Sequence, residues 1–232
     1  MKMIRFTPLV LVLAALLFCS QKATAQIEIG VKVSPSINST RTIAKDQYNF
    51  KNKGADAGFG MGIIADYFFG ANYAFSSGLI YNGKGGEVAY DYTIPTAGGT
   101  GTTQMKGSDD ISLQYLEIPV SLKLFTNEVA PDTRLYFQAG GSLNTMLAAK
   151  VNDKKVDSEG DKFTKRFNTF EVGAVLGAGA EWALGESTKL FGGLSYHRGL
   201  TDVDDDHYSG IFNDNKVELK SSSFALDFGI KF

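Results

Sequence analysis

The sequence has little cysteine and no marked excess of charge of either sign. Its single cysteine is Cys19, and 23 basic residues stand against 25 acidic ones, which gives a formal net charge of −2. Proteins that bind nucleic acid normally carry a basic surface, so we expect no nucleic-acid partner. Residues 98–101 (GGTG) have no lysine at the spacing of a phosphate-binding loop, and we expect no cofactor.

Long apolar runs are also scarce, and the one that stands out lies at the N-terminus. Residues 8–18 form an apolar stretch that follows Lys2 and Arg5 and precedes Ala23-Thr24-Ala25, a small-residue cleavage site. This pattern predicts a secretory signal peptide over residues 1–25. The stretch is too short for a membrane-spanning helix. Cleavage after Ala25 removes Cys19, which excludes disulfides, thiol nucleophiles and cysteine metal sites from residues 26–232.

Alternation of large apolar residues with small or charged ones dominates the remaining chain. The C-terminal segment is the clearest case, with Phe224, Leu226, Phe228, Ile230 and Phe232 on one face. Period two is typical of a β-strand with two different faces. It predicts strands within eight segments: 27–34, 58–66, 73–82, 115–124, 135–144, 170–182, 189–200 and 224–232.

The links between these segments alternate in length. Short links lie near residues 70–72, 126–133 and 185–187, and long polar links cover 38–54, 84–110, 150–168 and 201–222. Short turns at one end and long loops at the other are typical of outer-membrane barrels. We therefore predict an eight-stranded antiparallel up-and-down transmembrane β-barrel over residues 26–232, in the outer membrane of a Gram-negative bacterium. Residues 88–92 are expected to extend the third strand beyond the membrane.

The smaller face of each strand suits the interior of such a barrel, because eight strands leave room only for side chains. Charges of both signs fall on that face and can pair. A paired network is favoured over a pore. It comprises Glu28, Lys32, Glu117, Lys123, Glu171, Glu181, Asp227 and Lys231, with Asp66 and His197 beside them. An aromatic girdle is predicted near the short turns, formed by Tyr67, Phe68, Phe69, Tyr73, Phe125, Trp182, Phe191 and Phe232.

One stretch carries a family resemblance. Residues 113–123 (LQYLEIPVSLK), together with residues 29–32 (IGVK) and the terminal Phe232, resemble the PorT-like outer-membrane β-barrels of Bacteroidota. The resemblance covers nearly all of residues 26–232 and implies a small barrel without an assigned enzymatic activity. Some members of that family are linked to protein secretion. Phe232 also resembles the C-terminal signal read by the outer-membrane assembly machinery.

Two groups of residues are weighed as chemical sites. Ser195 and His197 share a strand face, and Glu171 or Glu181 could orient the imidazole as in a Ser-His-acid site. A lumenal hydrogen-bonding role is the favoured interpretation of this pair. Asp202, Asp204 and Asp206 imitate the start of a calcium loop, but His207 and Asn213 break the EF-hand pattern. A solvated acidic loop is favoured over a cation site.

We thus expect a non-enzymatic barrel with a structural or interaction role. Its expected partners are outer-membrane lipid, the assembly machinery, and an extracellular or secretion partner that contacts the long loops. Two alternatives remain open at this stage. A lipid-modifying enzyme would use Ser195 and His197 at the membrane interface. A soluble periplasmic, lipocalin-like binding barrel would bury Phe224, Leu226 and Phe228 inside.

Overall fold

The computed structural model describes residues 26–95, 102–212, 214 and 216–232. The predicted signal peptide and the glycine-rich stretch 98–101 lie outside the described residues. Eight long strands form the body: β1 (Gln26–Ile43), β3 (Asp56–Gly70), β4 (Tyr73–Pro95), β5 (Thr102–Ala130), β6 (Thr133–Val151), β7 (Phe170–Ala183), β8 (Lys189–Gly199) and β9 (Glu218–Lys231). The smaller elements are β2 (Lys51–Gly54), the 3₁₀ turns η1 (Asp46–Tyr48) and η2 (Phe163–Lys165), and α2 (His207–Phe212).

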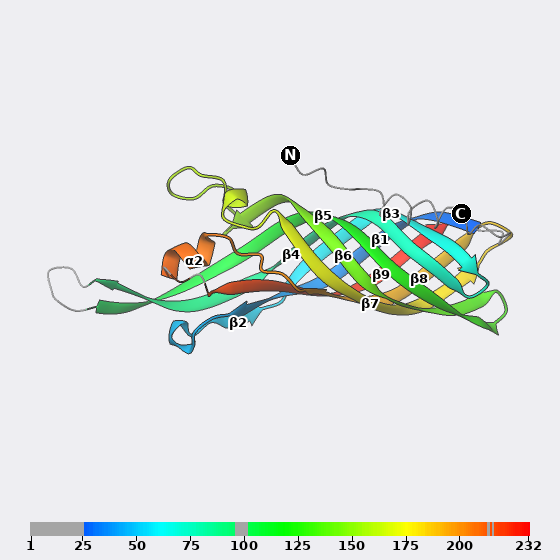
Figure 1. The fold of residues 1–232 in the computed structure, drawn as a ribbon, viewed down its shortest axis with the longest axis horizontal. Helices are drawn as coiled ribbons and strands as arrows, with labels where there is room; N and C mark the ends of the chain where they lie inside the picture. Colours follow the sequence, from blue (N-terminus) through cyan, green and yellow to red (C-terminus); the bar gives the residue numbers. More distant parts are fainter. Residues whose placement is uncertain (1–25, 96–101, 213, 215) are drawn as a thin grey trace, which may run out of the picture.

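The eight long strands close into a ring. Each pairs antiparallel with its neighbour in the chain, β4 pairs with β5, and β1 pairs with β9. The main chains of Ile29 and Phe232 exchange two hydrogen bonds at that seam, of 2.8 and 3.1 Å. Closure leaves no free sheet edge around the ring. A structure made of strands can lie in lipid only when it is closed in this way, because every backbone polar group is then paired. The predicted eight-stranded up-and-down barrel is confirmed (Figure 1). None of the described helices is long and apolar enough to span a bilayer.

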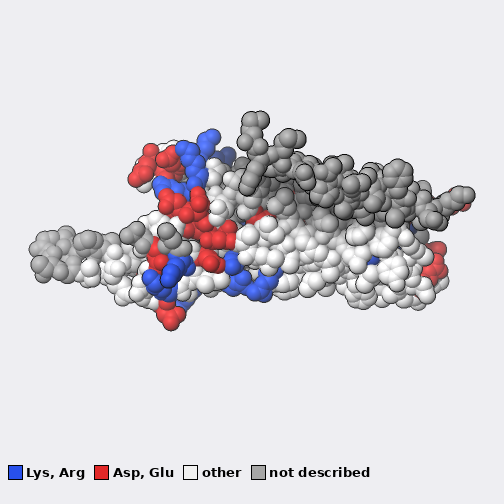
Figure 2. All heavy atoms as spheres, viewed as in Figure 1, with Lys and Arg blue, Asp and Glu red and all other residues white. Residues whose placement is uncertain are grey.

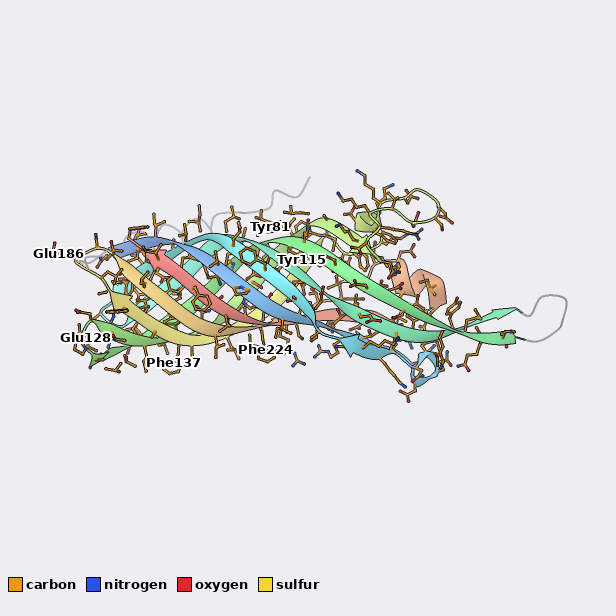
Figure 3. All side chains as sticks on the ribbon, turned by 180° about the vertical axis from the view of Figure 1, so that it is seen from behind. Tyr81, Tyr115, Glu128, Phe137, Glu186 and Phe224 are labelled. Carbon is orange, nitrogen blue, oxygen red and sulfur yellow. The ribbon has the colours of Figure 1, made fainter. Side chains whose placement is uncertain are left out.

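The outer face of the barrel is apolar over a band of defined height. On β1 the outward residues from Ile27 to Ile37 are mostly aliphatic and exposed. Ten residue steps of about 3.3 Å, tilted by about 40° from the axis, give a height of about 25 Å. That is the height of the apolar band of outer-membrane barrels. In Figure 3, Phe137 and Phe224 point away from the barrel, and Glu128 and Glu186 mark the end with the short turns.

Exposure of these apolar residues excludes the soluble alternative. Phe224, Leu226 and Phe228 are 67, 48 and 48% exposed, whereas polar residues of the same strand, such as Asp227, are buried inside. A soluble barrel would have the opposite arrangement. The lipocalin-like interpretation is therefore wrong for this chain.

The predicted aromatic girdle is only partly correct. Phe68, Phe125 and Phe191 are buried inside the barrel near the short turns, where they pack with Tyr136. Successive strand residues point to opposite faces, so position along the chain did not suffice to place them outside. The other predicted girdle residues are exposed: Tyr67, Phe69, Tyr73, Trp182 and Phe232.

A second set of aromatic residues lies at the opposite edge of the apolar band. Phe59, Tyr81, Phe170 and Phe224 are exposed there, and the ring centroid of Tyr196 lies 4.5 Å from that of Phe224. Aromatic residues at both edges are typical of a barrel that crosses a bilayer. From the sequence, a girdle is predicted at the short-turn end alone.

The long links do not form loose polar loops. They fold into a cap, formed by residues 44–54, 87–113, 146–169 and 200–219 as far as these are described, with a hydrophobic core of its own. Strands β4 and β5 remain paired as far as Pro95 and Thr102, so most of the predicted link 84–110 is a long hairpin that includes residues 88–92. In Figure 1 this hairpin projects furthest from the barrel, with α2 and β2 beside it and the C-terminus at the other end.

Candidate functional site

Lys231 is the centre of the charge network in the short-turn half of the lumen. Its Nζ lies 2.9 Å from Asp66 and 3.1 Å from Glu28, and it also contacts Glu181. Lys123 pairs with the same Asp66 at 3.0 Å. The side chains of this group are 6% exposed or less. Each charge therefore has a partner of opposite sign, which buried charges need.

Pairing continues through the half of the lumen below the cap. Lys32 lies 3.2 Å from Asp227, which also accepts a hydrogen bond from the Ser34 hydroxyl at 2.6 Å. Lys84 lies 2.7 Å from Glu171. The structure thus places all eight predicted network residues inside the barrel. It adds Lys84, which lies at the start of the predicted long link 84–110.

The lumen charges balance. The carboxylates are Glu28, Asp66, Glu117, Glu171, Glu181 and Asp227, and the bases are Lys32, Lys84, Lys123 and Lys231 inside, with Arg134 and Lys189 at the short-turn mouth. Six acids and six bases give no net charge when His197 is neutral. Lys84 could have been found from parity alone, because Asn82 is an inward residue and Lys84 follows two positions later.

Ser195 and His197 lie in the lumen in a triad-like geometry. The imidazole Nε2 is 3.2 Å from the Ser195 hydroxyl, and Nδ1 is 3.4 Å from Glu117 Oε1. The acid is therefore Glu117, across the lumen, rather than Glu171 or Glu181, which pair with lysines. The adjoining cavities have volumes of about 10 and 30 Å³. Space of this size accommodates one or two water molecules and no lipid substrate.

The acidic segment 202–206 is mostly structural rather than solvated. Asp202 accepts main-chain hydrogen bonds from Asp204 and Leu219, at 3.0 and 2.7 Å. Asp204 accepts two, both of 3.0 Å, from the main chain at the start of α2. Burial raises the pKa of both carboxyls. Asp206 pairs with Arg166 at 2.9 Å. Within the described ranges, no three His, Cys, Asp or Glu side chains form a group that could hold a metal ion.

The cap contains a groove of about 590 Å³. Its walls come from β4–β5, the segment 151–166 and α2. Val156 and Ile211 are 43 and 46% exposed and form apolar parts of its lining. Sequence reasoning missed this groove because its lining residues are far apart along the chain and follow no local period.

Asp109 joins three sides of this groove. It accepts hydrogen bonds from Tyr90 Oη at 3.0 Å and from Asn152 Nδ2 at 2.9 Å, and its Oδ2 lies 3.3 Å from His207 Nε2. Burial alone would raise the pKa of Asp109, but the hydrogen bonds from His207, Asn152 and Tyr90 outweigh it and lower the pKa. Asp109 thus stays ionised and ties β4, β5, the 152 turn and α2 together.

Arg166 links two walls of the groove by charge. Its Nη2 donates to Asp157 at 2.8 Å and its Nη1 to Asp206 at 2.9 Å. Its carbonyl oxygen accepts the main-chain N–H groups of Asp205 and Asp206, both at 3.1 Å. The groove is therefore preformed. A preformed, partly apolar cavity with a few placed polar groups is the usual form of a binding site.

The comparison with protein families agrees with this architecture. A family model described as "Outer membrane protein beta-barrel domain" matches residues 19–205. A search of curated proteins found no match.

Among solved structures, the chain is similar to Neisserial surface protein A, at 18% identity over 90% of this chain and 100% of that one, with a TM-score of 0.48. It is similar to OprG of Pseudomonas aeruginosa at 13% identity, covering 90 and 96% of the two chains, with a TM-score of 0.48. It is also similar to the outer membrane protease OmpT of Escherichia coli, at 10% identity over 91 and 99%, with a TM-score of 0.39. Similarity of this degree transfers no activity to this chain.

Proposed function

We propose that this chain, which belongs to the outer membrane protein beta-barrel domain family, is a non-conducting and non-enzymatic interaction protein of the Gram-negative outer membrane. The observation that carries the proposal is the contrast between the barrel lumen and the cap. The lumen is filled by paired charges, whereas the cap has its own core and a preformed groove of about 590 Å³. The barrel acts as an anchor, and the cap contacts the partner.

Two features support export and a role at the cell surface. The apolar N-terminal segment and the Ala23-Thr24-Ala25 site favour cleavage by signal peptidase, so N-terminal sequencing of the membrane-extracted protein should begin at Gln26. The stretch around Tyr115-Leu116-Glu117-Ile118-Pro119 supports placing the chain near the PorT-like barrels, and with them a partner in secretion or surface adhesion.

Conductance tests the closed lumen. Purified barrel reconstituted in a planar bilayer should give no stable current steps, with a porin in the same bilayer as the positive control. Eight strands with filled interiors leave no continuous water path. Reproducible channels at neutral pH would refute the non-conducting part of the proposal.

Cross-linking in cells tests the groove. A photoreactive amino acid at Val156 or at Ile211 should give the same defined protein adduct, because both side chains are exposed parts of the groove lining. The matched control is the same amino acid at Val129, which is 56% exposed near the short turns. The groove adduct should weaken when Arg166 is replaced by Ala, since Arg166 holds the walls. Equal adducts at all three positions would contradict a partner site in the cap.

The lipid-modifying alternative has one feature in its favour, the Ser195–His197–Glu117 geometry. The cavities beside His197 and Glu117 are large enough only for water, which argues against access by a lipid. Replacing Ser195 by Ala should leave the lipid composition of the outer membrane unchanged in mass spectra. A lipid species lost with S195A and restored by the wild type would establish the enzyme instead.

A further inference from the structure

Three basic side chains lie together on the outer face of the barrel where the apolar band ends and the cap begins. They are Arg41 on β1, Arg198 on β8 and Lys220 on β9. Figure 2 shows Lys and Arg side chains at this boundary, next to the uncharged surface of the barrel. No part of the site described above uses them.

The strand register places the three groups side by side. Arg41 is paired with Lys220, and Arg198 with Ser222, which is in turn paired with Ser39. All three side chains point outward. Arg41 and Lys220 are each four residues from an exposed outward residue of the same strand, Ile37 and Phe224 respectively. Arg198 is paired with Ser222, which is two residues from Phe224. The result is a patch of two guanidinium groups, one ammonium group and two hydroxyls on three adjacent strands.

Most of the charge of this patch has no partner within the protein. Across the described residues, neither Arg41 nor Arg198 has an ion pair, and Arg41 Nε is buried without a hydrogen-bond acceptor. Lys220 alone is paired, with Glu218 at 2.8 Å. Arg198 is exposed and Arg41 is half-buried, so the charge of both guanidinium groups is open to an anion from outside the protein.

The surface directly below the patch is apolar and aromatic. Ile37 and Phe224 are 62 and 67% exposed, and the ring of Tyr196 packs against that of Phe224. A ligand covering both surfaces must carry an anion above and apolar chains below. Guanidinium groups favour phosphate, which they bind through paired hydrogen bonds.

We propose that Arg41, Arg198 and Lys220 form a binding site for the phosphate of an outer-leaflet lipid, whose acyl chains lie on Ile37, Tyr196 and Phe224. The site is continuous with the lipid-facing band, so the occupant is a membrane lipid rather than a soluble anion. This inference rests on the outer-membrane placement proposed above. It requires no protein partner at the cap.

Native mass spectrometry of the full barrel released from detergent micelles tests the site. The probe is lipid A with two phosphates, and the comparison is lipid A with both phosphates removed. The triple variant R41Q/R198Q/K220Q should bind the phosphorylated probe at least tenfold more weakly than the wild type. The dephosphorylated probe should bind the wild type as weakly as the phosphorylated probe binds the triple variant.

The matched control is K51Q/K106Q/K155Q, which removes the same charge from exposed lysines of the cap and its hairpin. It should bind as the wild type does. An equal loss in both variants would reduce the effect to general electrostatics and overturn the site. So would tight binding of dephosphorylated lipid A, or displacement of the lipid by millimolar inorganic phosphate. Heat-modifiable migration in gels confirms that each variant is folded, and the cap cross-links report separately on the proposed function.

Discussion

The buried pair Lys84–Glu171 gives the sharpest test of the lumen network. The two side chains are 4 and 0% exposed, and Nζ lies 2.7 Å from Oε2. Replacing Lys84 by Met keeps the length of the apolar stem and removes the charge, so Glu171 is left buried without its partner cation. Breaking a buried ion pair in this way costs about 3–5 kcal/mol. Because folded proteins are stable by only about 5–15 kcal/mol, the loss should be large against the total.

The double variant K84M/E171Q distinguishes lost pairing from lost packing. It removes both charges, and the amide oxygen introduced by Glu171→Gln can still accept the hydrogen bond that the Ser221 hydroxyl donates to Glu171. Replacing both partners of a buried pair by neutral groups is close to neutral for stability. The double variant should therefore lie within about 1 kcal/mol of the wild type, which makes it several kcal/mol more stable than K84M.

Equilibrium unfolding in urea, from lipid vesicles, measures these differences. Trp182 is the only tryptophan and is 55% exposed at the lipid face, so its fluorescence reports its transfer from lipid to water. The matched control is K53M, which breaks the exposed Lys53–Glu87 pair of 3.9 Å and should cost less than about 1 kcal/mol. A K84M barrel within about 1 kcal/mol of the wild type would refute the reasoning. So would a double variant as unstable as K84M.

Three further predictions concern the lipid face, the lumen wall and the cap. Val31→Arg, near the middle of the apolar band, should cost about 2–4 kcal/mol in the same urea assay, whereas Ile43→Arg, above the band, should cost about 0–1 kcal/mol. Gly229→Val should abolish the folded, heat-modifiable gel band, because a Cβ there would lie 2.2 Å from a carbonyl oxygen of β1. Gly192→Val should keep the band, because the heavy atom nearest to its Cβ, on Phe228, would be 3.7 Å away. Asp109→Asn should speed amide exchange in the cap at pH 7. The pKa of Asp109 is lowered in the folded protein, so the stabilisation by its carboxylate is fully present above the pKa of the unfolded state, about 3.9. That stabilisation is lost as the pH falls through the pKa of the folded state. The difference between wild type and variant should therefore shrink as the pH falls below about 3.9, after correction for intrinsic rates, and a difference that stays constant down to the acid limit of folding would contradict this account.

Period-two alternation predicted most of the barrel because it is a local signal. A strand shows its outer face at every second residue, so runs such as Phe224 to Phe232 identify strand and orientation together. The same parity predicted the lumen charges. Where the parity was not applied, the prediction was wrong: Phe68 lies between outward Tyr67 and Phe69 and points inside.

The cap could not be predicted in this way. Its core joins Val88, Phe163, Val203 and Tyr208, which are buried but isolated within polar segments. Each segment alone has too few apolar residues for a periodic signal, and only the tertiary structure brings them together. The role of Asp204 could not be predicted either. Its carboxylate accepts main-chain hydrogen bonds at the start of α2, but in the sequence it is one of several acidic residues in a polar segment.

The charged lumen follows from the demands of the lipid face. A narrow interior could be filled by apolar side chains, but each strand would then be apolar on both faces and read as a continuous hydrophobic run. Such a run is prone to aggregate before it reaches its sheet partners. Polar residues at every second position keep the mean hydropathy at −0.07, and pairing them in the closed barrel offsets the cost of burying them. The lumen network thus follows from what folding of the barrel requires, which leaves the cap groove and the basic patch at the membrane boundary as the surfaces whose residues folding alone does not account for.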